Sequence, residues 1–86
     1  MDPDAAMKEL LDAVNRRDWD RVDELAEGLL SWMEKRGFPP TTLGPKELGR
    51  AWHRALATFV CYAAQTKAQD ARKRRKKKEK EGIDAS

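Results

Sequence analysis

The sequence has 86 residues and a net charge of +3, from 18 Lys and Arg against 15 Asp and Glu. This length suits one small domain, no apolar run approaches the roughly 20 residues that span a bilayer, and a single cysteine excludes an internal disulfide framework. So short a chain cannot both form a core and enclose a deep pocket, which argues against a large enzyme.

The first predicted helix covers residues 3–16. Asp2 is a helix-capping residue, and Pro3 suits the first helical position. Apolar residues then recur at helical spacing, with charged residues on the opposite side: Met7, Leu10, Leu11 and Val14.

The second predicted helix begins after its cap, Asp18, and runs to about Arg36 with a broad apolar face. Gly37 is expected to supply a left-handed cap, and the two prolines that follow cannot continue a helix. The link around Arg17 is so short that the first two helices should form an antiparallel hairpin.

The third predicted helix opens at Gly44-Pro45, after a stiff loop over residues 38–44. Its apolar residues alternate in steps of four and three: Leu48, Trp52, Ala55, Phe59 and Tyr62. We call these five residues the aromatic stripe and expect it to face the core, widened by its apolar neighbours. Beyond Thr66 the sequence becomes almost wholly polar, which favours an exposed helix that frays.

Together these elements predict an all-α fold. A helical hairpin and a long third helix should form a small three-helix bundle over residues 1–66. A basic C-terminal extension should follow over residues 67–86. A core this small is only modestly stable, so a homodimer that buries more apolar surface is a further expectation.

The hairpin carries a resemblance in three short stretches, LLDA at residues 10–13, DWD at 18–20 and LAE at 25–27. These resemble a single tetratricopeptide-type helical pair, which implies a helix-turn-helix over the first 36 residues. The chain has one pair, whereas such arrays share a core among about three. The stretch LSWMEKRGFPP at residues 30–40 is similar to small uncharacterised helical proteins of phage and planctomycete type, and this likeness implies no function.

His53 is the only histidine and Cys61 the only cysteine. They lie two turns and about 80° apart on a helix, so neither a metal site nor a Cys–His nucleophile pair is expected. On the helical wheel Cys61 lies near Arg50 and Arg54. Arginine neighbours favour the thiolate, and the alternative is an ordinary, partly covered residue. Without a phosphate loop or catalytic motif, we expect no enzyme activity, no cofactor and no metal.

Four acidic residues share one face of the second predicted helix, opposite its apolar side: Asp20, Asp23, Glu27 and Glu34. Acid–base catalysis requires carboxylates that converge on a pocket, so we expect this face to be solvated. The alternatives are a docking surface for a basic protein, imitation of a nucleic-acid backbone, or contact with the basic end of the same chain.

The net charge conceals an acidic half and a basic half. Residues 1–34 hold ten acids and four bases, whereas residues 67–81 hold nine bases and three acids. Seven consecutive cations stand in the basic half: Arg72, Lys73, Arg74, Arg75, Lys76, Lys77 and Lys78. Such a run displaces counterions from nucleic acid, and no aromatic residue interrupts it for base stacking. On a continuous helix Arg50 and Arg54 would lie on the same side as Arg72 and lengthen the basic strip.

The sequence therefore predicts a small non-enzymatic protein that binds the DNA or RNA backbone with little sequence preference. The alternative is a protein-interaction module, as a homodimer, an inhibitor or an adaptor, that uses the acidic face and the aromatic-rich helices. The remaining interpretations of the basic run are a solubilising tail, a nuclear-localisation-like run in a suitable host, or a tether to an acidic protein. A membrane role is not expected, because the basic segment lacks apolar anchors. An acidic N-terminus and a single free cysteine favour a cytoplasmic location.

Overall fold

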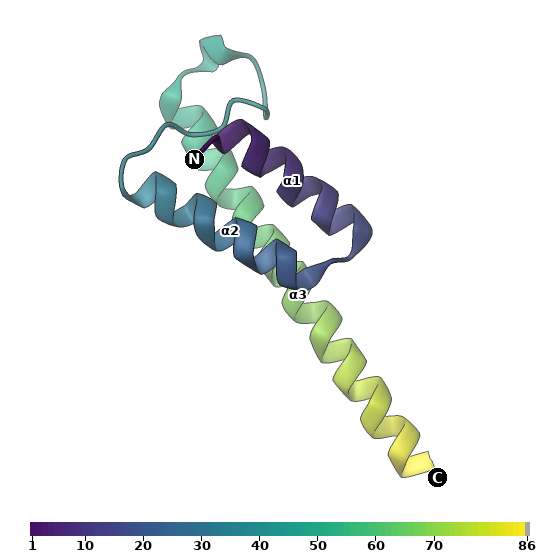
Figure 1. Cartoon of the computed structure of the whole chain (residues 1–86). Helices are drawn as coiled ribbons and strands as arrows, with labels where there is room; N and C mark the ends of the chain where they lie inside the picture. Colours follow the sequence, from purple (N-terminus) through teal and green to yellow (C-terminus); the bar gives the residue numbers. More distant parts are fainter. Residues whose placement is uncertain (86) are drawn as a thin grey trace.

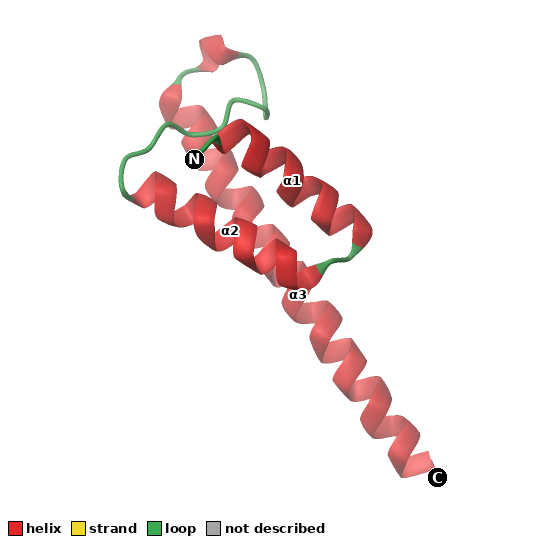
Figure 2. Cartoon of the chain, viewed as in Figure 1, coloured by secondary structure: helices red, strands yellow, loops and turns green. Residues whose placement is uncertain are grey.

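The structure, a computed structural model, describes residues 1–85, with side chains described for residues 1–74. The three helices are α1 (Pro3–Arg16), α2 (Trp19–Glu34) and α3 (Arg50–Ala85). A two-residue turn joins α1 to α2, and a longer connection over residues 35–49, which includes a 3-10 turn, η1 (Lys46–Leu48), joins α2 to α3. α1 and α2 form a hairpin, and α3 crosses behind both (Figure 1). Helices and loops make up the whole of the described chain (Figure 2), which confirms the all-α bundle.

The ends of the hairpin helices follow from their local sequence. The Asp2 carboxylate accepts hydrogen bonds from two backbone N–H groups of the first turn of α1, at 3.1 and 3.3 Å. Asp18 caps α2 in the same way, at 3.4 Å. Between them, Arg17 adopts the left-handed conformation (φ 61°) that ends α1. The predicted antiparallel hairpin is confirmed.

α2 ends at Glu34, earlier than predicted, and the left-handed residue after it is Arg36 (φ 64°) rather than Gly37. Glycine is required at position 37 for another reason. The ring of Trp32 lies directly on it, and a Cβ there would overlap the ring. The indole N–H of Trp32 also donates a hydrogen bond to the Phe38 carbonyl, at 2.7 Å. The close approach of Trp32 therefore fixes the start of the loop.

The loop between α2 and α3 is held to α1. Pro39 and Pro40 are buried, and the backbone N–H of Thr41 donates to the Asp4 carboxylate at 2.6 Å. α3 begins at Arg50 rather than near residue 45, because Gly49, the residue between η1 and α3, has a φ of 94° that interrupts the helix.

The core combines large side chains from the hairpin with small ones from α3: Met7, Leu10, Ala13, Val22, Ala26, Leu29, Met33, Ala57, Cys61, Ala64 and Ala68. His53 is buried beside them, with 1% of its surface exposed. Its Nε2 lies 2.9 Å from the Pro45 carbonyl oxygen. Because a carbonyl only accepts, Nε2 carries the proton and joins α3 to the loop before it.

The expectation that the aromatic stripe faces the core is wrong. Trp52, Phe59 and Tyr62 expose 47, 69 and 57% of their surface. α3 has two apolar faces, and the face with Ala57 and Cys61 is buried. Small residues allow the helices to approach closely, so that the hairpin's leucines and methionines fill the interior without the aromatic rings.

The packed part of α3 extends beyond Thr66. Ala68 is fully buried, and Arg72 contacts α2 one turn later. The boundary between bundle and extension therefore lies nearer Arg72 than Thr66, and α3 continues past it as one helix (Figure 1). None of the helices in the described part is long and apolar enough to cross a membrane.

Candidate nucleic-acid interface

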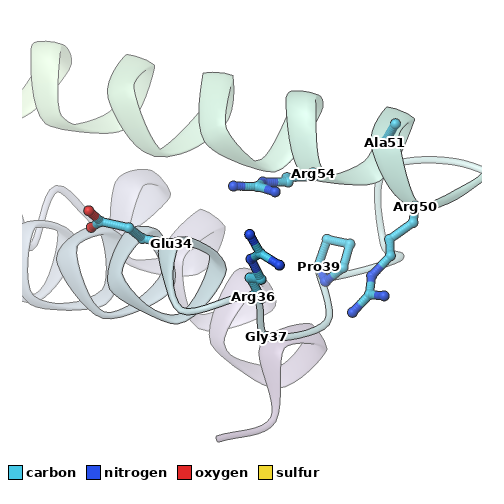
Figure 3. A pocket seen from close by; sticks show the side chains of 7 residues that line it. All are labelled: Glu34, Arg36, Gly37, Pro39, Arg50, Ala51 and Arg54. Carbon is cyan, nitrogen blue, oxygen red and sulfur yellow. The ribbon is translucent and has the colours of Figure 1, made fainter.

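The first candidate phosphate site is a groove between the end of α2 and the start of α3. Two predicted residues, Arg50 and Arg54, line it together with Arg36, and Figure 3 shows Arg36 and Arg54 extending into the same space. The groove is open and has a volume of about 760 Å³. Its lining is Glu34, Arg36, Gly37, Pro39, Arg50, Ala51 and Arg54. We call it the arginine groove.

The arginine groove carries more positive than negative charge. Glu34 is the single carboxylate in its lining, against three guanidinium groups. Among the described side chains, none of these arginines forms an ion pair. Arg50 stacks on the Phe38 ring, 4.7 Å from its centroid, which limits its motion. Guanidinium groups present paired N–H donors that match a phosphate, so the groove can hold a backbone phosphate.

Arg36 was not among the residues predicted from sequence. The sequence predicted a second helix that runs to about Arg36, which would place this residue at the helix end. The chain instead reverses at Arg36 and brings its side chain to α3. The one available signal was the Lys35-Arg36 pair directly before a glycine and two prolines.

Arg72 was predicted to contact nucleic acid, and the structure pairs it within the chain instead. Its guanidinium group donates to Asp23 and, at 2.8 Å, to Asp20, both at the start of α2. The hydrogen bond to Asp23, supported by Asp20, raises the pKa of Arg72 above its ordinary value. Two residues of the predicted acidic docking face are therefore occupied by the chain's own arginine. Glu27 and Glu34, the other two, are exposed.

A second basic groove lies at the root of the extension. Arg74 and Lys67 from α3 meet Arg17 from the hairpin turn around a space of about 370 Å³. Trp19, Asp70 and Ala71 complete its lining. We call it the root groove. Lys73 beside it is exposed, and the side chains of the four remaining predicted contacts lie outside the described residues: Arg75, Lys76, Lys77 and Lys78.

The predicted continuous strip is thus two separate sites. Arg54 and Arg74 are 20 positions apart, which is about 30 Å along a helix. On the side of α3 that carries Arg54 and Arg72, Thr58 and Gln65 provide no charge, and Cys61 is buried; Arg74 lies about 160° away around the helix. The strip is interrupted because Arg72 turns toward α2.

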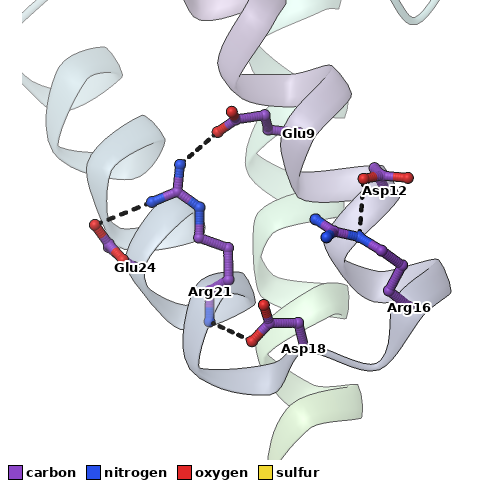
Figure 4. A network of polar contacts seen from close by, with 6 residues as sticks. All are labelled: Glu9, Asp12, Arg16, Asp18, Arg21 and Glu24. Carbon is purple, nitrogen blue, oxygen red and sulfur yellow. Dashed lines mark hydrogen bonds and ion pairs between the residues drawn. The ribbon is translucent and has the colours of Figure 1, made fainter.

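Two other arginines of the hairpin are also used within the chain (Figure 4). Arg21 pairs with Glu9 of α1 at 2.6 Å and with Glu24 at 3.1 Å, and Arg16 pairs with Asp12 at 2.9 Å. The hydrogen bonds to Glu9 and then Glu24 raise the pKa of Arg21. Such exposed pairs stabilise a fold only slightly. They leave Lys8 and Arg17 as the cations of residues 3–34 without an ion-pair partner among the described side chains.

Cys61 is fully buried, and burial raises the pKa of its thiol from 9.0 to about 11. The reactive-thiolate hypothesis is wrong, because the arginines near Cys61 on the helical wheel reach outward to the arginine groove.

We expect native Cys61 to resist iodoacetamide below pH 9 and to react at once in denaturant. Because the folded thiol holds its proton more tightly, its contribution to the free energy of unfolding is complete below pH 9 and is lost between pH 9 and 11. Urea unfolding of the native chain and of Cys61→Ala across this pH range separates the contribution of the Cys61 thiol from the contributions of other groups. Rapid labelling of the folded chain would contradict the burial.

Within the described residues, no three His, Cys, Asp or Glu side chains are grouped to hold a metal ion. Comparisons with family models, curated proteins and solved structures found no match to this chain. The resemblances to a tetratricopeptide pair and to phage and planctomycete proteins stay predictions.

Proposed function

We propose that this protein is a non-enzymatic nucleic-acid-binding protein of a reducing, cytoplasmic compartment, and that it contacts backbone phosphates with little sequence preference. One observation carries the proposal. Arg16, Arg21 and Arg72 are paired with carboxylates, whereas six of the ten cations without ion-pair partners among the described side chains line the two grooves along α3: Arg36, Arg50, Arg54, Arg17, Lys67 and Arg74. A buried free thiol is compatible with a reducing setting.

The proposed contacts are electrostatic. The arginine groove supplies guanidinium groups that can bind one phosphate through paired hydrogen bonds. The root groove continues into the basic run of residues 73–78, which supplies charge along the backbone. Phosphate contacts carry no sequence information by themselves, so binding should depend on salt more than on base sequence.

The structure gives less support to the acidic face as a docking site for a basic protein. Asp23 is half-buried and, with Asp20, holds Arg72. A basic partner would have to displace Arg72 to reach these two carboxylates. Without that displacement, only Glu27 and Glu34 of the acidic face are open.

The test is fluorescence anisotropy with labelled duplexes of unrelated sequence, of DNA and of RNA, at about 50–200 mM salt. We expect all duplexes of one kind to bind alike, with log K falling linearly with log salt. Replacing Arg36, Arg50 and Arg54 with glutamine should reduce that slope by about 0.9 for each phosphate that the variant no longer neutralises.

The matched control replaces Arg16 and Arg21, which are already paired on the hairpin, and should leave the slope unchanged. Absence of binding at low salt would overturn the proposal. Equal reductions in the groove variant and the control would show that the arginine groove is not a phosphate site.

A further inference from the structure

The exposed aromatic stripe is the largest feature that phosphate binding does not use. Trp52, Phe59 and Tyr62 leave about half to two-thirds of their surface open. Since an aromatic side chain offers roughly 150–250 Å², these three expose on the order of 300–400 Å² on one side of one helix. Contiguous apolar patches of this size on a small protein commonly contact another macromolecule.

The same face of α3 is uncharged for about five turns. Its exposed residues between positions 51 and 69 are neutral: Ala51, Trp52, Ala55, Phe59, Tyr62, Ala63, Thr66 and Gln69. Arg54 and Lys67 lie at opposite borders, about 100–120° from its centre on a helical wheel. An acidic protein, a basic protein or a nucleic acid would find no charge to pair with at the centre of this face, whose neutral stretch ends at exposed Asp70. The complementary surface is a neutral, apolar one.

We propose that the aromatic stripe is the contact surface between two copies of this chain, paired along α3. A second copy offers a neutral surface of the same length and the same spacing. Alternating steps of four and three residues are the repeat by which two helices pack side by side over several turns. With the exposed alanines beside the rings and half-exposed Leu48, the face approaches the roughly 800 Å² per partner of a standard interface.

Charge sets the orientation of the pair as antiparallel. A parallel pair would place the seven consecutive cations of residues 72–78 beside those of the other copy, where they repel. An antiparallel pair sends the two basic extensions to opposite ends. With the twofold axis at the level of residue 57, Phe59 of one copy meets Ala55 of the other, and Trp52 meets Tyr62. Large rings then face small residues or another ring, which suits close packing.

A shallow hollow on this face provides space for the second copy. It has a volume of about 470 Å³, opens to solvent, and is lined by Phe59, Tyr62, Ala63, Thr66, Lys67 and Asp70. In the antiparallel arrangement, Ala51 and Trp52 of the second copy lie at the levels of Ala63 and Tyr62, which line the hollow. The first turn of the second α3 therefore lies against it.

Sedimentation velocity on nuclease-treated protein tests the pairing, over concentrations up to roughly 1 mM. We expect a concentration-dependent change from one 9.8 kDa chain to two. Phe59→Glu should raise the dissociation constant at least tenfold without changing the helicity measured by circular dichroism. The control, Leu11→Glu, alters a 44% exposed leucine on α1 and should leave the dimer unchanged.

Three results would overturn the pairing. The first is a chain that stays monomeric at every concentration, which would assign the stripe to a different protein. The second is assembly beyond a dimer. The third is an equal effect of Phe59→Glu and Leu11→Glu on the dissociation constant. No nucleic acid is present in this experiment, so its failure and the failure of phosphate binding are distinguishable.

Energy transfer between the ends of the two extensions tests the orientation. Ala85→Cys introduces a second thiol for labelling, and buried Cys61 should not compete with it. In the antiparallel pair the two labels lie roughly 80 Å apart, so donor-labelled and acceptor-labelled chains should show almost no transfer when mixed. Strong transfer would show a parallel pair and overturn the antiparallel arrangement.

Discussion

Replacing Arg75, Lys76, Lys77 and Lys78 together with glutamine is expected to weaken duplex binding by at least roughly 60-fold at 0.1 M salt. The reason is counterion release, because each neutralised phosphate contributes about 0.9 to the slope of log K against log salt. If the variant neutralises at least two fewer phosphates, the slope falls by about 1.8. Because the logarithm of 0.1 M salt is −1, log K at this salt concentration also falls by about 1.8, which is roughly 60-fold. Glutamine keeps the helix propensity of the segment, so the change isolates charge.

Two control variants make this prediction specific. Replacing Lys76, Lys77 and Lys78 with arginine keeps the charge and should keep both affinity and slope. Arg72→Gln removes a cation from the same run, but that cation is paired with Asp20 and Asp23, so the slope should change less than in Arg74→Gln. A larger effect of Arg72→Gln than of Arg74→Gln would contradict the intramolecular pairing of Arg72.

Leu29→Ala should lower the free energy of unfolding by about 2–5 kcal/mol. Leu29 lies at the centre of the core and is fully buried, so the shorter side chain leaves a cavity. A chain of this length has a total stability of roughly 4–13 kcal/mol, and the decrease is a large part of it. Urea denaturation followed by circular dichroism measures the change.

Leu11→Ala is the matched control, because Leu11 lies on the hairpin with 44% of its surface exposed. The same truncation there should lower the free energy of unfolding by well under half as much as at Leu29. Equal decreases at the two positions would show that the hairpin does not bury the face that carries Leu29.

The hairpin was predictable because its signals are local. Asp2 and Asp18 cap helices within three residues of themselves, and two residues between α1 and α2 allow only a reversal. Apolar residues on these helices also form a single face, so there was no choice of which side to bury.

The orientation of α3 was not predictable in this way. The helix has one face of large aromatic residues and another with Ala57, Cys61 and Ala64. A ranking of the two faces by hydrophobicity selects the aromatic face for burial, which is wrong. What decides the outcome is the space left by Met7 and Leu29, and that depends on three helices at once.

The candidate nucleic-acid interface was also only partly predictable from the sequence. Basic residues are easy to find in a sequence, but their partners are not. Arg72 is paired across 49 positions with Asp23, and Arg36 meets Arg54 only because the chain reverses after α2. Long-range pairings of this kind decide which cations remain for a ligand.

The unbroken passage of α3 from the bundle into the extension affects how the basic run becomes ordered. Starting a helix is the unfavourable step, because several residues must be ordered for the first hydrogen bond, whereas each later turn adds to an existing end. The packed turns up to Arg72 serve as the nucleus, so the basic segment requires only propagation. Repulsion between like charges four residues apart opposes that propagation, and phosphates relieve it. A ligand that neutralises these charges would therefore stabilise a helix that already extends from the bundle, instead of folding a free chain.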